Sequence, residues 1–261
     1  MSNPLLPTFI IGGAPRSGTT YLAEALARHP DVFMARPFIP EPKVFMGPRQ
    51  PLEVYEARYQ ALFELAGLQR ARGEKTSYYL ENPDLCDTIL SVAPGVRMVF
   101  IVREPVSRAY SNYLWSKKNG LETLTFEEAI AQEGKRPNPL SSDKAYAKPF
   151  DYLERGDYCA LAAPYLERFG IDNVLFVVYE DIADRPARLL DRIQDFIGVD
   201  RLPFARLDVG VVNSAREIGA PIAPETEALL HERMRPSMER FAALTGLDIS
   251  PWRTRPCRMS A

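Results

Sequence analysis

The sequence predicts an α/β fold in which a mostly parallel sheet carries helices on both faces. Three short apolar runs, at residues 8–13, 96–102 and 173–180, are typical of buried strands. A helical pattern follows each run, and this alternation favours parallel strand pairing. The chain has 261 residues and is 46% hydrophobic, so we expect one domain over residues 1–261.

The first half of the chain predicts these elements in order. The first strand ends in glycines, and apolar residues at helical spacing then predict a helix from near Gly18 to just before Pro30. The proline-rich segment 31–50 has no clear period, so we expect a loop or short turns there. The following elements are expected to be a helix at 53–67, a strand or loop edge at 73–80, a helix near 83–92 and the strand at 96–102.

The second half begins with a helix that directly follows the second core strand. Residues 118–150 interrupt the alternation, since they hold a short helical pattern at 125–133 and then a polar stretch rich in proline and serine. We expect a mobile, loop-rich surface insertion there. The elements expected after it are a helix at 156–169, the strand at 173–180, helices at 184–197 and 224–245, an irregular segment at 201–222 and a loose tail at 253–261.

The composition argues against several classes of protein. The net charge of −2 does not favour binding to nucleic acid or to an anionic membrane surface. No apolar stretch is long enough to cross a membrane, and we see no signal peptide, so we expect a cytoplasmic protein. The three cysteines and two histidines lack metal-ligand spacing, which argues against a zinc centre. The oligomeric state is not predicted.

The segment between the first strand and the first helix has the features of a phosphate-binding loop. It reads Gly13-Ala-Pro15-Arg16-Ser17-Gly18-Thr19-Thr20. Glycines let backbone N–H groups approach an anion, and the start of the helix adds partial positive charge. The arginine supplies a cation with forked donors, and the threonines supply hydroxyl groups. The alternative is a plain turn between a strand and a helix.

This loop is close to the Walker A pattern, so we expect a P-loop-like fold. Thr19, however, stands at the position of the Walker lysine. The strand that ends at Val102 is followed by Arg103, where a magnesium-binding protein would carry an acidic residue. The glycine spacing also does not fit the dinucleotide pattern GxGxxG. We therefore expect a nucleotide site that needs no metal.

A second anion site is predicted after the second core strand. Arg103 lies at the end of that strand, and Ser111 lies about two turns into the next helix. Because the carboxyl ends of parallel strands meet at one sheet edge, both side chains can reach an anion beside the first loop. The alternative for Arg103 is that it pairs with Glu104 or caps a neighbouring helix.

The segments PRSGTTYL and VREPVSRAYSNYLW together resemble the two donor-binding motifs of sulfotransferases that use 3′-phosphoadenosine 5′-phosphosulfate (PAPS). The resemblance covers about residues 8–200 and implies that the first motif binds the 5′-phosphosulfate. It implies that Arg103 and Ser111 bind the 3′-phosphate. Many carbohydrate-modifying members have lysine where this chain has Arg16, which keeps the charge but changes the geometry.

The resemblance also indicates residues for catalysis. The segment PEPKVF resembles one that carries a glutamate base in the carbohydrate-type branch, and here the base would be Glu41. This sequence departs from that branch at Lys43, where histidine is common. The segment GEKTSY makes Lys75 a candidate for orienting the acceptor or the base, or for stabilising charge on the sulfuryl group. Arg216 could reach the 3′-phosphate or the adenine. For Glu41 and Lys75 the alternative is an ordinary solvated side chain.

The predicted function is therefore sulfuryl transfer from PAPS, with 3′,5′-ADP as the product, to a hydroxyl of a small molecule or carbohydrate. The expected reaction is an in-line, metal-independent displacement. Two alternatives remain at this point. One is a P-loop nucleotide kinase or NTPase, and the other is a catalytically inactive nucleotide-binding protein.

Overall fold

A computed structural model describes residues 5–210 and 221–253. The chain divides into two compact units. Unit 1 comprises Met1–Val102 and Ala163–Asn213, and unit 2 comprises Arg103–Ala162 and Ser214–Ala261. Within the described residues, no helix is long and apolar enough to cross a membrane.

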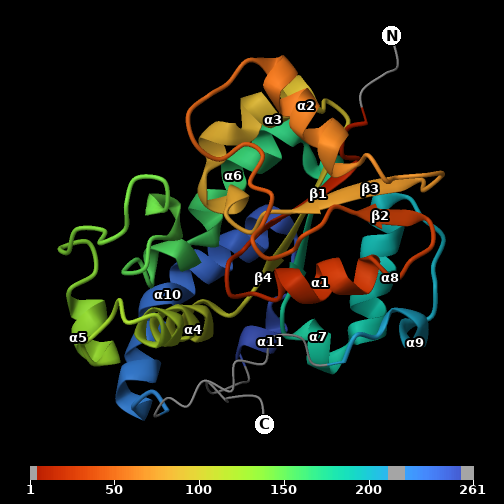
Figure 1. The fold of residues 1–261 in the computed structure, drawn as a ribbon. Helices are drawn as coiled ribbons and strands as arrows, with labels where there is room; N and C mark the ends of the chain where they lie inside the picture. Colours follow the sequence, from red (N-terminus) through yellow and green to blue (C-terminus); the bar gives the residue numbers. More distant parts are fainter. Residues whose placement is uncertain (1–4, 211–220, 254–261) are drawn as a thin grey trace. The chain divides into compact units, whose positions relative to one another are not determined.

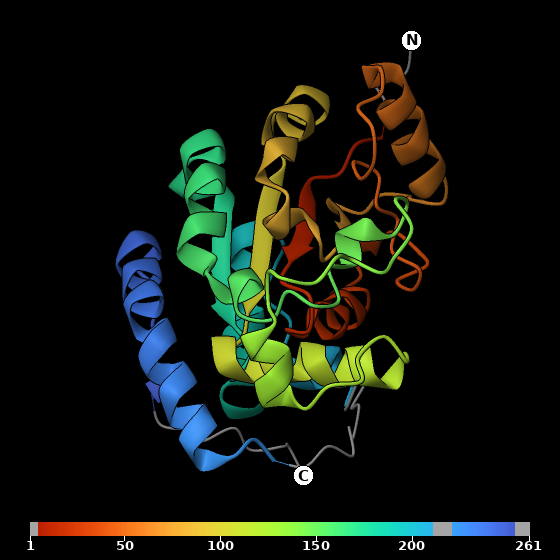
Figure 2. The same ribbon diagram turned by 90° about the vertical axis from the view of Figure 1, so that its left-hand side faces the viewer.

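Unit 1 contains a five-stranded parallel sheet in the order β2-β3-β1-β4-β5. The strands are β1 (Phe9–Gly13), β2 (Val32–Met34), β3 (Ala71–Lys75), β4 (Arg97–Val102) and β5 (Val174–Val178). Figure 2 shows β1, β4 and β5 side by side. The chain continues from β1 toward β2 on one side and reaches β4 on the other, so the topology reverses between β1 and β4. In open α/β sheets, ligands bind at the carboxyl ends of the strands at such a reversal.

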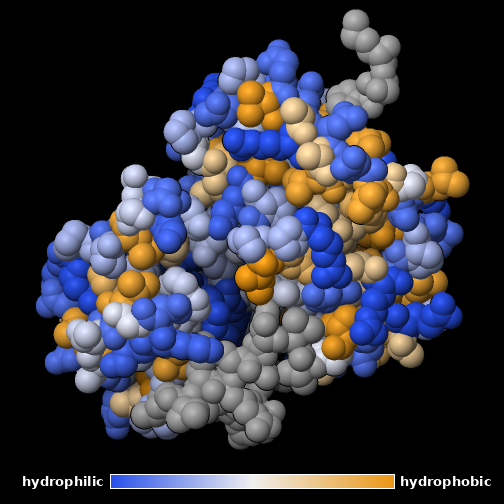
Figure 3. Space-filling model, in the orientation of Figure 1, coloured by the Kyte–Doolittle hydropathy of each residue, from blue (hydrophilic) through white to orange (hydrophobic). Residues whose placement is uncertain are grey.

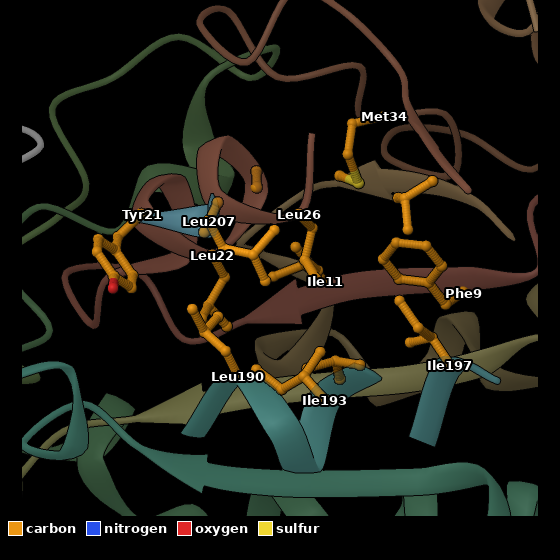
Figure 4. Close-up of a cluster of buried hydrophobic side chains, with 14 of the residues drawn as sticks. Phe9, Ile11, Tyr21, Leu22, Leu26, Met34, Leu190, Ile193, Ile197 and Leu207 are labelled. Carbon is orange, nitrogen blue, oxygen red and sulfur yellow. The ribbon is translucent and has the colours of Figure 1, made fainter. Parts of the chain in front are cut away.

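Helices cover both faces of this sheet, which confirms the predicted fold class. On one face, Leu22 of α1 (Thr19–Leu26) and Leu190 of α8 (Pro186–Ile197) pack with Ile11 in a buried apolar cluster (Figure 4). On the other face, Phe100 packs against Tyr165 of α6 (Tyr158–Phe169), with ring centroids 4.8 Å apart. The remaining helices of unit 1 are α2 (Leu52–Leu62), α3 (Cys86–Val92), α7 (Asp181–Asp184), α9 (Phe204–Leu207), η1 (Tyr79–Glu81), η2 (Pro83–Leu85) and η5 (Ile171–Asn173) (Figure 1).

The structure differs from the predicted elements at β2, at the end of α2 and at α9, among other places. Strand β2 forms in the segment expected as loop or turns, because its three residues pair with β3 at the edge of the sheet. Helix α2 ends at Leu62 rather than at Gly67, because the backbone already leaves helical geometry at Phe63, which has φ of −106° and ψ of 12°. Short α9 lies in the segment 201–222, which was expected to be irregular.

Unit 2 is helical and contains an aromatic core in which Tyr158 packs on Phe241 and Trp252. Its helices are α4 (Pro105–Lys118), α5 (Phe126–Ala131), α10 (Pro224–Thr245), α11 (Ser250–Arg253), η3 (Ala145–Ala147), η4 (Glu154–Gly156) and the first part of α6. The long α10 matches the predicted helix at 224–245. Of the tail expected to be loose, residues 254–261 lie outside the described residues.

The segment 118–150 contains α5 inside the predicted short helix and is attached to unit 2 through a buried carboxylate. Glu122 accepts hydrogen bonds from Arg136 at 2.7 and 2.9 Å and from the Tyr152 hydroxyl at 2.7 Å. Burial opposes ionisation of Glu122, but these bonds outweigh it and lower its pKa to about 2. The mobility expected for this insertion stays a prediction.

Candidate functional site

The predicted phosphate loop connects the central strand β1 to helix α1. Gly18 is the N-cap of α1 with φ of 87°, and Arg16 has φ of 69°. A Cβ atom on Gly18 would lie 2.7 Å from the Ile182 side chain and 3.0 Å from that of Tyr179. Only glycine therefore fits this position without displacing its neighbours. The loop places the backbone N–H groups that begin α1 at the carboxyl end of β1.

Ser17 supplies the clearest sign that this loop is built for a ligand. Its side chain is completely buried, yet its Oγ atom has no hydrogen-bond partner among the described residues. A buried hydroxyl without a partner is destabilising, and such groups are rare in folded proteins. The neighbouring Thr19 is also buried, at 6% exposure. The loop thus fits an oxyanion that would accept the Ser17 hydrogen bond.

A chain of polar contacts joins the loop to the predicted base. Lys75 Nζ donates to Thr20 Oγ1 at 3.3 Å and forms an ion pair with Glu41 Oε1 at 2.8 Å. The side chains of Lys75 and Glu41 are only 2% and 11% exposed, so both are shielded from solvent. The alternative of two solvated surface side chains is therefore wrong. Three residues that the sequence analysis nominated separately lie in one cluster.

This cluster also contains Ser77, which the sequence analysis did not nominate. Its backbone N–H donates to Glu41 Oε2 at 3.0 Å, and its hydroxyl donates to Oε1 at 2.8 Å. With Lys75, these bonds fix both carboxylate oxygens in position. The sequence did contain an indication, because Ser77 follows Lys75 by two residues in the segment already identified. Strand β3 ends at Lys75, and Ser77 lies in the turn that follows it.

The second predicted anion motif lies in unit 2. Arg103 is bonded to Val102, the last residue of β4, and the neighbour of β4 in the sheet is β1. The Tyr158 hydroxyl holds the Arg103 backbone, since it accepts the N–H at 3.4 Å and donates to the carbonyl at 2.9 Å. Ser111 lies on α4 and is 8% exposed. The motif thus begins where β4 ends, as the sequence predicts.

Glu104 and Arg108, which lie between Arg103 and Ser111 in the sequence, make contacts within the protein. Glu104 caps α4 by accepting the N–H groups of Val106 at 2.8 Å and Ser107 at 2.7 Å. Arg108 is completely buried and donates to the Tyr152 carbonyl. Arg216 lies outside the described residues, so the structure does not test its predicted role.

An open groove of about 640 Å³ lies beside the loop that carries Glu41. Figure 3 shows apolar side chains on this side of unit 1, where Figure 1 places α2 and β2. The groove is lined by Phe33, Met34, Arg36, Pro42, Val44, Arg58, Ala61, Leu62, Glu64 and Leu65. Pro42, which lines the groove, follows Glu41 directly in the chain, but Glu41, Lys75 and Ser77 are not among the lining residues.

Comparison with known proteins gives consistent results. A family model described as "Sulfotransferase domain" matches residues 6–204. Heparan sulfate glucosamine 3-O-sulfotransferase 3B1 of Mus musculus is 28% identical over 197 residues, which are 76% of this chain and 47% of that protein. Heparan sulfate glucosamine 3-O-sulfotransferase 6 of Homo sapiens is 30% identical over 201 residues, 75% of this chain and 53% of that protein. The chain thus spans about half the length of the curated relatives it matches.

Solved structures agree with this result. The crystal structure of a sulfotransferase from Alicyclobacillus acidocaldarius has a TM-score of 0.73 and 27% identity, covering 95% of this chain and 99% of that one. Mouse sulfotransferase SULT7A1, complexed with PAP, has a TM-score of 0.53 and 18% identity, with 92% of each chain covered, and it supports the fold alone. Because the family model matches residues 6–204, which include β1 to β5 and both predicted motifs, the chain belongs to the sulfotransferase family.

Proposed function

We propose that this protein transfers a sulfuryl group from PAPS to a hydroxyl of a carbohydrate or small-molecule acceptor. The observation that carries the proposal is the contact chain from Thr20 through Lys75 to Glu41. It puts a carboxylate that can accept a proton next to a loop that can bind an oxyanion. A positioned general base typically accelerates such a step by about 10²–10⁴-fold.

In the proposed reaction, the acceptor oxygen forms a bond to sulfur as the bond between sulfur and the donor phosphate breaks. Glu41 takes the proton of the acceptor hydroxyl. As Glu41 becomes neutral, Lys75 loses its counter-charge and can stabilise the negative charge that develops beside Thr20. Ser77 keeps the carboxylate oriented throughout. No step in this scheme needs a metal ion.

The two anion motifs would bind the two ends of the donor, which supplies the activated sulfuryl group. Arg16, Gly18 and the loop from Pro15 to Thr20 would bind the 5′-phosphosulfate, and the partnerless Ser17 hydroxyl would donate to it. Arg103 and Ser111 would bind the 3′-phosphate, with Arg216 as a further contact. The position of β4 next to β1 supports this division, because both motifs then begin at neighbouring strand ends.

We also propose that the acceptor extends from Glu41 along the adjacent groove. The curated relatives are named for heparan sulfate, an acidic carbohydrate. The groove has apolar walls and is lined by two arginines, Arg36 and Arg58, and one glutamate, Glu64, so its lining carries a net positive charge that suits an acceptor with sulfate or carboxylate groups. A cytoplasmic location is proposed from the cysteines, since Cys86 and Cys159 are free.

The test combines donor binding with product detection. Calorimetry should detect binding of 3′,5′-ADP, and mass spectrometry should detect a sulfated product after incubation with PAPS and a panel of acidic oligosaccharides and phenols. Turnover should persist in EDTA, whereas the kinase alternative predicts ATP turnover that EDTA abolishes.

Replacing Arg16 with alanine should remove a charge-assisted contact and slow transfer by about 10- to 150-fold. Unchanged transfer by that variant would show that its assigned role is wrong, and nucleotide binding without any transfer would favour an inactive binding protein.

A further inference from the structure

The interior of unit 1 contains a carboxylate that the proposed reaction does not use. Glu74 lies in β3 and is completely buried. Its two oxygens accept hydrogen bonds from the Tyr59 hydroxyl at 2.9 Å and the Thr76 hydroxyl at 3.3 Å, and Tyr79 provides a third bond. Removing a carboxylate from water is costly, and an apolar side chain would fill this space without that cost. The polar group therefore calls for a reason beyond packing.

Two of these three hydroxyl groups also contact the loop that carries the proposed base. Thr76 Oγ1 accepts the backbone N–H of Lys43 at 3.0 Å, and the Tyr79 hydroxyl accepts the N–H of Phe45 at 3.2 Å. These two residues lie two and four positions after Glu41. The buried carboxylate is thus connected through two side chains to the backbone of the catalytic loop.

The direction of these bonds depends on the charge of the carboxylate. A hydroxyl group has one hydrogen to donate and two lone pairs that accept. An ionised carboxylate only accepts, so it makes the hydroxyls of Thr76 and Tyr79 donate toward Glu74. Their lone pairs are then free to accept the N–H groups of the loop. A neutral Glu74 carries a hydrogen and can itself donate to one of these hydroxyls. The hydroxyls of Thr76 and Tyr79 could then adopt other orientations.

The loop needs such support because its backbone is strained. Lys43 has φ of 52°, a left-handed conformation that is unfavourable for residues with a side chain. Phe45 anchors the other end, packed between the rings of Tyr55, Tyr59 and Tyr79. The bond from Lys43 to Thr76 therefore holds a turn that would otherwise relax and move the side chain of Glu41.

We infer that Glu74 is a positioning residue, whose ionised carboxylate orients the hydroxyls of Thr76 and Tyr79 and through them fixes the loop that presents Glu41. Glu74 touches neither of the proposed substrates. The expected effect on turnover rests on the proposed function. The effect on the geometry of the loop does not, since it can be measured without any substrate.

The burial of Glu74 makes its charge sensitive to pH near neutrality. The pKa of Glu74 is raised from 4.5 to about 7, mainly by burial and to a lesser extent by the charge of Glu41, and the hydrogen bonds from Tyr59, Tyr79 and Thr76 offset part of this rise. Burial raises the pKa values of Tyr59 on α2 and Tyr79 on η1 well above 10, so both stay protonated through pH 9. Lys75, the next residue on β3, projects to the other side of the strand. Loop order should therefore increase as pH rises through about 7.

The first test measures turnover in variants of matched size. Glu74→Gln should lower kcat by about tenfold at pH 9 and should remove the rise of kcat through pH 7, while KM for PAPS stays within about twofold. Thr76→Val should lower kcat by about three- to tenfold, because it breaks one connection to the loop. Tyr59→Phe is the control, since among the described residues that hydroxyl bonds only Glu74.

The control makes a distinct prediction of its own. The Tyr59 hydrogen bond lowers the pKa of Glu74, so the Tyr59→Phe variant should keep its kcat at pH 9 but reach it with a midpoint shifted to higher pH. A purely structural network would not move this midpoint. If Thr76→Val loses no more turnover than Tyr59→Phe, or if Glu74→Gln keeps the rise through pH 7, the inference is wrong.

The second test needs no activity and separates this inference from the proposed function. Amide hydrogen exchange should be about three- to tenfold faster at Lys43 and Phe45 in Glu74→Gln than in the parent, and unchanged at these amides in Tyr59→Phe at pH 9. If the parent protein transfers no sulfuryl group but these amides respond as stated, the proposed function fails and the positioning role stands. Unaltered exchange in Glu74→Gln would overturn the positioning role.

Discussion

Replacing Glu74 with glutamine removes one ionisation from the interior of unit 1 at almost constant side-chain volume. Burial is the main cause that raises the pKa of Glu74 from 4.5 to about 7 in the folded protein. The unfolded chain therefore releases this proton near pH 4.5, and the folded protein keeps it until about pH 7. Between these values the folded state binds more protons, so the free energy of unfolding falls as pH rises. At about 1.4 kcal/mol per pKa unit, the total fall is about 3 kcal/mol.

Urea unfolding followed by tyrosine and tryptophan fluorescence from pH 4 to pH 9 measures this effect. The free energy of unfolding of the parent minus that of Glu74→Gln should fall by about 3 kcal/mol between pH 4.5 and 7 and stay level above about pH 8. Subtracting the variant removes the contributions of other groups, such as Glu122. Tyr59→Phe should extend the fall to higher pH, because one bond that lowers the pKa of Glu74 is lost. A constant difference over the whole range would refute the reasoning, since Glu74 would then titrate alike in the folded and unfolded states.

Three further substitutions test the candidate site. Ser17→Ala should leave the free energy of unfolding unchanged or raise it by about 1 kcal/mol, because the substitution removes a buried hydroxyl without a partner. The same variant should bind 3′,5′-ADP about tenfold more weakly in calorimetry. Lys75→Met should lower the free energy of unfolding by about 3 kcal/mol in urea, since it leaves the shielded carboxylate of Glu41 without its cation, and adding Glu41→Gln should restore part of the loss. Ala61→Trp should fill the groove beside α2 and raise KM for an acidic acceptor in steady-state assays, while KM for PAPS stays the same. If the variant and the parent have the same KM for the acceptor, the proposed acceptor path is wrong.

The sequence predicted the parts of the fold that depend on strong local patterns. The apolar runs of β1, β4 and β5 and the long α10 are all recovered, since buried strands and amphipathic helices leave a clear periodicity. Strand β2 was missed because its three residues become a strand only by pairing with β3, and no local pattern reports that pairing. Helix α2 was expected to reach Gly67 because glycine is a typical end signal, whereas the backbone leaves helical geometry at Phe63, where the sequence carries no such signal.

The candidate site shows the same limit at the level of single residues. Thr20, Glu41 and Lys75 could be named from motifs, but their contacts could not be predicted, because Glu41 lies in a loop with no periodicity. Glu74 was not nominated, since in the sequence it is an ordinary charged residue beside a lysine. Its proposed role depends on hydrogen bonds that Thr76 and Tyr79 accept from Lys43 and Phe45, more than thirty residues earlier in the chain. Buried hydrogen bonds between distant segments are a property of the tertiary structure.

The segment from Glu74 to Ser77, which is the end of β3 and the turn after it, contacts residues on both sides of the strand. Because successive residues of a strand project to opposite sides, Lys75 points to Thr20 of α1 while Glu74 points to Tyr59 of α2. Figure 1 shows these two helices on opposite sides of β3. Insertion of one residue before Glu74 would move each side chain to the other side of the strand. The carboxylate would then lie against the phosphate loop, and the ammonium group would lie on the side that faces Tyr59. The parallel register that pairs Ile11 with Lys75 is therefore as necessary for the proposed chemistry as the residue types themselves.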